Sequence, residues 1–167
     1  MALLDRHSFE ATSNSEEQTL RLGARLGSML PSHCVVALQG EMGAGKTAFA
    51  RGLGEGWGTS QPLRSPSFTL IQKHSRPQDS AVLYHVDLQR IESASDLASI
   101  GLRDLLEEEE VIVLIEWPER AEALLPPNAL HIRIRSISET KRQFMFSAKN
   151  DQAWKVLIAF RKAAFGV

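Results

Sequence analysis

Hydrophobic residues along the chain form two patterns, short unbroken runs and runs in which every second residue is polar. Unbroken runs at 35–39 and 111–115 predict strands that are buried on both faces, as in a parallel sheet covered by helices. Strict alternation over 130–135, continued at 144–146, predicts strands with one exposed side, which favours antiparallel pairing. We therefore expect a mixed sheet with a parallel core and antiparallel additions.

Helical spacing of leucines predicts a first helix from Glu16 to about Leu30, after a capping box at Ser13–Glu16. Residues 68–72 and 81–86 predict a hairpin around a polar turn. Further helices are expected at 47–57, 93–106 (as one helix or two), 120–125 and 152–165, the last capped by Asp151. With helices on both faces of the sheet, the chain is predicted to form a single three-layer α/β domain over residues 1–167.

Three glycines, Gly52, Gly54 and Gly56, fall inside the predicted helix 47–57. Each weakens a helix by roughly 1 kcal/mol relative to alanine. Two interpretations are open: close packing of this helix against the sheet, or early fraying. Gly58 suits the left-handed position that ends a helix.

A phosphate-binding pattern lies between the first predicted strand and this helix. Gly40-Glu41-Met42-Gly43-Ala44-Gly45-Lys46-Thr47 fills every fixed position of G-x-x-x-x-G-K-[ST]. The glycines let successive N–H groups point at one spot, where the helix adds the positive end of its dipole. Lys46 supplies a charge for the outer phosphates, and the Thr47 hydroxyl can bind Mg²⁺. A chance glycine-rich turn is the alternative, but the strand before and the helix after favour a P-loop NTPase-like nucleoside-triphosphate site.

Two acidic residues stand where predicted strands end. Asp87 follows Tyr84-His85-Val86, and Glu116 follows Val111–Ile115. Open α/β sheets bind ligands at the carboxyl ends of their strands. Glu116 is therefore a candidate for binding the metal or positioning water, and Asp87 and Lys46 join it as candidate catalytic residues. The alternative is that each acid only marks where a strand meets solvent.

Four other positions allow both a functional and a structural interpretation. Ser67, in the loop 65–69, carries a hydroxyl for magnesium or water, although Ser-Pro-Ser is also common in turns. Trp117 suits stacking near the nucleotide or packing at the edge of the core. His85 is a possible base, but a structural histidine is the simpler interpretation. Arg90 suits a phosphate contact or a surface salt bridge.

Composition limits the compartment and the partners that we expect for this protein. The formal net charge is −1 and there is one cysteine, Cys34, so no internal disulfide is possible. No apolar run is long enough to cross a bilayer, and the N-terminus lacks the pattern of a secretion signal. We expect a cytoplasmic protein without membrane or DNA partners. From His131 onward, the sequence contains eight Lys/Arg and two acidic residues. This excess of positive charge suits either a solvated surface or a face that binds RNA or an acidic partner.

Four pieces taken in order are more specific than any one of them. The segments 40–47, 65–70, 85–90 and 116–118 together resemble the bacterial TsaE (YjeE) family, and the resemblance runs from about residue 16 to residue 134. It implies an ATPase of tRNA N6-threonylcarbamoyladenosine (t6A) synthesis that works with the TsaB–TsaD complex and reaches tRNA through it. Hydrolysis of ATP would reset that complex between turnovers, while the complex itself transfers the threonylcarbamoyl group.

The resemblance also implies roles for individual residues. Residues 40–47 would hold the phosphates and Thr47 the magnesium, Asp87 and Glu116 would serve the metal and the attacking water, and 65–68 would form a switch-like loop. Trp117 would lie near the nucleotide. Two positions depart from the family pattern. Gln89 replaces a common tyrosine, which puts an aromatic contact in doubt, and Ser67 replaces a common threonine, which keeps the hydroxyl.

Other classes of protein share parts of this pattern. A small-molecule or nucleoside kinase has a similar loop and length but needs an arginine-bearing lid, and the sequence contains no such insertion. A GTPase is disfavoured because no Asn-Lys-x-Asp precedes Ser147-Ala148-Lys149. A non-catalytic adaptor switched by its nucleotide is the third alternative. Loss of turnover in a Glu116→Ala variant would separate an ATPase from an adaptor.

Overall fold

The computed structural model describes residues 7–64 and 70–167, which form one seven-stranded sheet with helices on both faces. The strands are β1 (Ser8–Ser13), β2 (Cys34–Gln39), β3 (Ile71–Ser75), β4 (Val82–Asp87), β5 (Val111–Glu116), β6 (Leu130–Ser136) and β7 (Arg142–Ala148). The helices are α1 (Glu16–Gly27), α2 (Lys46–Trp57), α3 (Ala94–Ser99), α4 (Leu102–Glu107), the 3-10 helix η1 (Pro118–Leu124) and α5 (Asp151–Phe165).

The sheet is mixed, as predicted, with strand order β1-β7-β6-β2-β5-β4-β3. β2 pairs in parallel with β5 and β6, and β5 pairs in parallel with β4. β1, β7 and β3 add antiparallel pairs at the two edges, and β3 and β4 form the expected hairpin. The predicted parallel core with antiparallel additions is therefore confirmed.

β6 corrects one expectation about pairing. Its alternating pattern favoured antiparallel neighbours, yet β6 is parallel to β2 and antiparallel only to β7. Leu130, Ile132 and Ile134 are buried, while Arg133 and Arg135 are exposed. The alternation thus reports that one face of this part of the sheet is open to solvent, and says nothing about strand direction.

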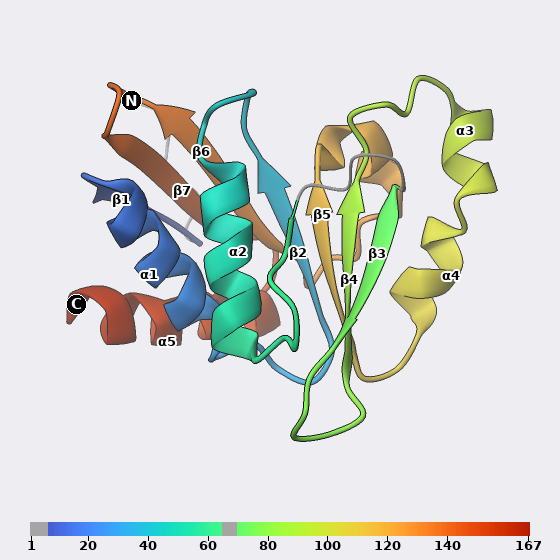
Figure 1. Ribbon diagram of the computed structural model, residues 1–167, viewed down its shortest axis with the longest axis horizontal. Coiled ribbons are helices and arrows are strands. Elements are labelled where there is room, and N and C mark those ends of the chain that lie inside the picture. Colours follow the sequence, from blue (N-terminus) through green and yellow to red (C-terminus); the bar gives the residue numbers. More distant parts are fainter. Residues whose placement is uncertain (1–6, 65–69) are drawn as a thin grey trace.

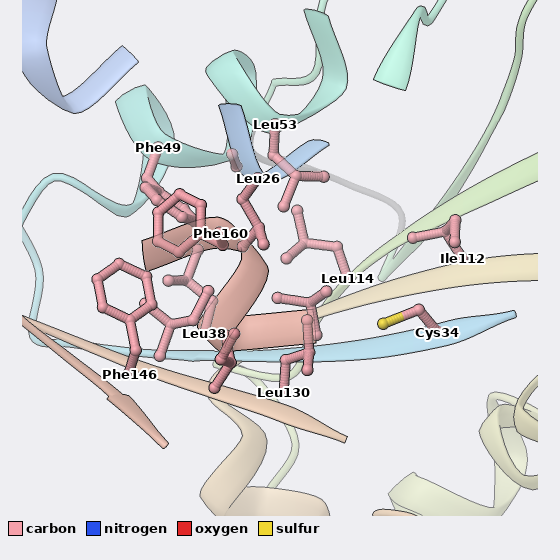
Figure 2. Close-up of a cluster of buried hydrophobic side chains, with 14 of the residues drawn as sticks. Leu26, Cys34, Leu38, Phe49, Leu53, Ile112, Leu114, Leu130, Phe146 and Phe160 are labelled. Carbon is pink, nitrogen blue, oxygen red and sulfur yellow. The ribbon is translucent and has the colours of Figure 1, made fainter. Parts of the chain in front are cut away.

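Alternate residues of β2 enter two different cores. Val36 and Leu38 pack with α1, α2 and α5, while Val35 packs with α4 and η1 on the other face. Figure 2 shows the first core, in which Phe146 and Phe160 lie near Leu38. This arrangement gives the three layers predicted from the sequence.

The helices α1 and α2 lie side by side because glycines let their backbones meet (Figure 1). A Cβ atom on Gly52 would overlap the carbonyl of Leu20, and one on Gly56 would overlap the carbonyl of Ala24. Close packing is therefore the reason for these two glycines. The prediction that they pack against the sheet is wrong, because their partner is α1. The helix does not fray early, since it continues to Trp57 and ends at Gly58 in the left-handed conformation.

Both predicted N-terminal helix caps are displaced by one or two residues. α1 is capped by Ser15, whose hydroxyl accepts a hydrogen bond from the Gln18 N–H. Ser13 is buried instead, with its hydroxyl 2.8 Å from that of Thr19. α5 is capped by Asn150, so the predicted cap Asp151 is the first residue of the helix. In each case a second polar residue near the helix start competes for the cap.

Strand limits differ from the prediction at two places. β3 begins at Ile71 and continues to Ser75, so the turn is shorter than expected, and part of the predicted strand 68–72 lies outside the described residues. β1 has no counterpart among the predicted elements. Its six residues form an edge strand that pairs only with β7, where little burial is required. The helical region 93–106 consists of two short helices, α3 and α4.

Candidate functional site

A cavity of about 720 Å³ opens at the carboxyl ends of β2, β4 and β5. It brings together predicted site residues from three separate segments of the chain. Those that line it are Glu41, Met42, Gly43, Gly45, Lys46, Thr47, Asp87, Arg90, Glu116 and Trp117. Ala44 is buried behind the loop, and Ser67 lies outside the described residues. Gly40 and His85, like Ala44, do not line the cavity, and the other described candidate residues do.

The loop between β2 and α2 has the backbone that the glycine pattern demands. Gly43 and Gly45 have φ of 79° and 105°, values that residues with a Cβ rarely adopt. Gly45 is the N-cap of α2 and offers no side chain to the first N–H groups of the helix. Met42 is 78% exposed and lines the cavity as part of this loop. The loop therefore leaves main-chain donors available to an anion.

Lys46 is held inside the cavity by the loop itself. Its Nζ donates to the carbonyl oxygens of Gly40 and Glu41, and lies 4.4 Å from the centre of the Trp117 ring. Only 7% of the residue is exposed. Burial lowers the pKa of Lys46, and the nearby carboxylates of Glu116 and Asp87 oppose this effect. The partners of the ammonium are thus uncharged loop carbonyls. An anionic acceptor would bind the ammonium more strongly and replace them.

The two candidate acids stand side by side on neighbouring strands. Asp87 and Glu116 are partners in the β4–β5 register. Glu116 is almost fully buried, and its Oε2 lies 2.6 Å from Nε2 of His85, which is also buried. Asp87 is less buried, and its Oδ1 accepts a hydrogen bond from the Gln89 N–H. His85 thus is a buried, hydrogen-bonded histidine whose partner is one of the two candidate acids.

Burial raises the pKa of Asp87, and the charge of Glu116 adds to this rise. The hydrogen bond from Gln89 and the positive charge of Lys46 act in the opposite direction. Two carboxylates at the wall of one cavity therefore repel each other, and a cation between them would relieve that repulsion.

Trp117 lies between the acid and the next helix in an uncommon conformation. Its φ of 59° and ψ of 49° are left-handed, although it carries a bulky side chain. Such a conformation costs roughly 1 kcal/mol or more and persists only where the surrounding structure imposes it. Here it turns the chain from β5 into η1, and the ring lies beside Lys46. The backbone therefore places Trp117 in the cavity.

Sequence reasoning missed several residues of this cavity. Glu16, Thr19, Arg51, Glu139, Thr140 and Arg142 also line it. Arg142 was noted only as part of the basic C-terminal region. No local pattern marks it, because it reaches the loop through the sheet order β7-β6-β2, which pairs segments far apart in the sequence.

Among the described residues, no group of three or more His, Cys, Asp or Glu side chains is arranged to hold a metal ion. A dedicated all-protein metal cage is therefore not found in that part of the chain. Within 7–64 and 70–167, no helix combines the length and apolar composition needed to cross a bilayer.

Comparison with known proteins places this cavity in a family. The sequence profile described as "Threonylcarbamoyl adenosine biosynthesis protein TsaE" matches residues 13–144. The chain belongs to the TsaE family. The matched range contains β2, the glycine loop, both acids, Trp117 and Arg142, so the TsaE profile covers the whole cavity lining.

Individual TsaE relatives agree with this assignment. The tRNA threonylcarbamoyladenosine biosynthesis protein TsaE of Treponema pallidum is 37% identical over 132 residues, covering 78% of this chain and 94% of that protein. The TsaE protein of Mycobacterium tuberculosis H37Rv is 35% identical over 135 residues, covering 78% and 80%. The crystal structure of Bacillus subtilis YdiB has a TM-score of 0.74 and 24% identity, covering 93% and 95%, and shows the same fold.

Proposed function

We propose that this protein is an ATPase that hydrolyses ATP with Mg²⁺ in support of the TsaB–TsaD complex during t6A synthesis. The observation that carries the proposal is the meeting of Lys46, Asp87 and Glu116 around a glycine loop in one cavity. Membership of the TsaE family supplies the biological setting. The ATPase activity, the cofactors and the partner complex are our inference from this combination.

The glycine loop suits a chain of phosphates. A Cβ atom on Gly43 would meet no atom of a described residue within 4 Å, so no described side chain fills the space beside the loop there. The N–H groups at the start of α2 would donate to phosphate oxygens. The Lys46 ammonium would exchange its loop carbonyls for those oxygens, which are stronger acceptors because they are charged.

The donor set also suits magnesium held jointly by protein and nucleotide. Mg²⁺ in such sites takes one or two protein ligands, and phosphate oxygens and water complete its octahedron. The Thr47 hydroxyl and Glu116 are the proposed protein ligands, with Asp87 beside them. The metal would supply charge neutralisation at the transferred phosphate.

Asp87 and Glu116 would hold and orient the attacking water. His85 occupies Oε2 of Glu116, which leaves Oε1 for the metal or the water. Positioned acids of this kind contribute about 10²–10⁴-fold to a rate. Trp117 would cover the Lys46 side of the cavity and limit its access to solvent.

The proposed partner is the TsaB–TsaD complex, with tRNA reached through that complex in the cytoplasm. Ser67 and the segment around it keep the switch-like role that the family resemblance implies. The exposed face of β6, with Arg133 and Arg135, is a proposed docking region for RNA or an acidic surface.

The test is ATP turnover by the purified protein, alone and with TsaB–TsaD. We expect slow hydrolysis alone and a higher rate with the complex, and loss of turnover but retained nucleotide binding in Glu116→Ala. Glu109→Ala, an exposed acid outside the cavity, is the matched control and should keep full activity. Equal rates with and without the complex would contradict the coupling. Rapid phosphate transfer to a small alcohol or nucleoside would favour a kinase, and unaltered partner binding without any turnover would favour an adaptor.

A further inference from the structure

The cavity receives its side chains from opposite sides of β2. Asp87 and Glu116 come from β4 and β5, while Arg142 stands at the start of β7, beyond β6 on the other side. Neighbouring strands lie about 4.8 Å apart, so β4 and β7 are each roughly 10 Å from β2. The loop that follows β2 therefore has the acids on one flank and Arg142 on the other.

Arg142 is fixed against the loop by hydrogen bonds from both ends of its guanidinium. Nη1 donates to the carbonyl oxygens of Ser138 at 2.7 Å, Lys141 at 3.1 Å and Glu139 at 3.3 Å. Nη2 donates to the carbonyl oxygen of Gly43 at 3.4 Å. The turn between β6 and β7 thus holds the arginine and presents it to the glycine loop.

The side chain of Arg142 also lies directly over Gly45. A Cβ atom on Gly45 would stand 3.6 Å from Nε and 3.8 Å from Cδ of the arginine. Gly45 is the N-cap of α2, where an anion is favoured. The guanidinium therefore borders the same space as the first N–H groups of that helix.

The charge of Arg142 is not neutralised by an acid within the described chain. No salt bridge joins it to a carboxylate in that part, whereas Arg51, also in the cavity wall, has Glu16 at 3.3 Å. The acceptors of Arg142 are uncharged carbonyls, and Nε has no hydrogen bond to a described residue. An anionic ligand is the partner that this guanidinium lacks.

We propose that Arg142 binds the inner phosphates and nucleoside end of the nucleotide, and so holds ADP and ATP alike. This inference rests on the proposed function. The outer phosphate of ATP must lie beside Asp87 and Glu116 to react, so the rest of the molecule extends toward the opposite flank. Arg142 and Thr140 form the cavity wall there. Arg142 thus acts in binding, unlike an arginine that stabilises the transferred phosphate.

The test compares wild type, Arg142→Ala, Arg142→Lys and Arg21→Ala in equilibrium binding of Mg²⁺-ATP and Mg²⁺-ADP and in steady-state hydrolysis. Arg21 is the matched control, because it is an exposed arginine of α1 that donates to Glu17 and lies outside the cavity. For Arg142→Ala we expect both nucleotides to bind at least about tenfold more weakly, with KM raised similarly and kcat within about threefold. Arg142→Lys should fall between, since lysine keeps the charge without the fork.

Two results would overturn the inference. Unchanged binding of both nucleotides in Arg142→Ala would refute the inference. A large fall in kcat with unchanged ADP binding would also refute it, because the arginine would then act on the outer phosphate. Should Arg142→Ala not fold, as judged by its thermal unfolding, Arg142→Lys decides by the same two measurements. Failure of wild type to bind ATP would refute the proposed function itself, whereas normal wild-type turnover with Arg142→Ala equal to Arg21→Ala refutes only the role of Arg142.

Discussion

His85 and Glu116 form a buried pair at the wall of the cavity, with Nε2 and Oε2 2.6 Å apart and less than 4% of either side chain exposed. A buried carboxylate without a partner is costly, so the histidine stabilises an acid that the proposed chemistry needs. The pair joins β4 to β5 at the strand ends where Asp87 also stands. Fold stability and the proposed activity therefore depend on the same contact.

Replacing His85 by alanine should lower the free energy of unfolding by roughly 3 kcal/mol, because Glu116 would be left buried without its partner. Removing Glu116 as well should cost much less than the sum of the two single changes. Chemical denaturation of the two single variants and the double variant measures this coupling. His33→Ala, outside the pair, is the control, and additive effects would show that the two residues are independent.

Nucleotide binding should change the fluorescence of Trp117. The Lys46 ammonium lies 4.4 Å from the Trp117 ring, and a phosphate chain on the loop would draw it away. The chain contains three tryptophans, so the signal can be assigned by substitution. We expect Trp117→Phe to lose most of the change in emission on adding Mg²⁺-ATP and Trp154→Phe, a ring that contacts His7, to keep it. A change that persists in Trp117→Phe would place its source elsewhere.

Gly52→Ala and Gly56→Ala should each destabilise the protein by more than about 2 kcal/mol, despite the better helix propensity of alanine. The added methyl groups would overlap carbonyl groups of α1, and backbone atoms have little freedom to move. Gly54→Ala is the matched control in the same helix, because the atoms nearest to its methyl, Cγ and Cδ1 of Leu63, belong to a side chain and not to the backbone. Thermal unfolding of the three variants should rank Gly54→Ala as the mildest, and an equal loss in all three would argue against backbone contact.

Cys34 should make stability fall at alkaline pH. Burial raises the pKa of its thiol from 9.0 to about 12, so the folded protein keeps a proton that the unfolded chain releases above pH 9. Unfolding then releases a proton, and stability declines between pH 9 and 12 by up to about 1.4 kcal/mol per pH unit from this group. Near pH 7 the thiol is neutral in both states and contributes nothing to the slope.

The measurement compares the pH dependence of unfolding for wild type and Cys34→Ala. Alanine lowers stability near neutral pH by removing buried volume, but it should flatten the decline above pH 9. The thiol of the folded wild type should also react slowly with iodoacetamide at pH 8 and quickly once the protein is unfolded. Parallel pH profiles for the two proteins would refute the buried thiol as the cause.

The parts of the site that the sequence predicted are those fixed by local rules. The loop 40–47 carries its own geometry in its glycines, and Asp87 and Glu116 follow apolar runs whose ends meet at one edge of a parallel sheet. Lys46 and Trp117 lie in the cavity because they adjoin these elements in sequence. Nothing beyond short-range pattern was needed for them.

The parts that were missed depend on contacts between distant segments. Arg142 reaches the loop only because β7 pairs with β6 and β6 with β2. The partner of Gly52 and Gly56 is α1, which no pattern inside α2 specifies. β1 is an edge strand with few buried residues, so its sequence carries a weak signal. The cap of α1 depends on a choice between Ser13 and Ser15 that burial of Ser13 decides.

The contact between α1 and α2 has a mechanical consequence. Main chain touches main chain there, without flexible side chains to absorb a displacement. The first turn of α2 supplies Lys46 and Thr47, and the first turns of α1 supply Glu16 and Thr19 at the rim of the same cavity. A small tilt of one helix would therefore move the other with it as one rigid unit, so a movement at the cavity would extend over that whole side of the molecule.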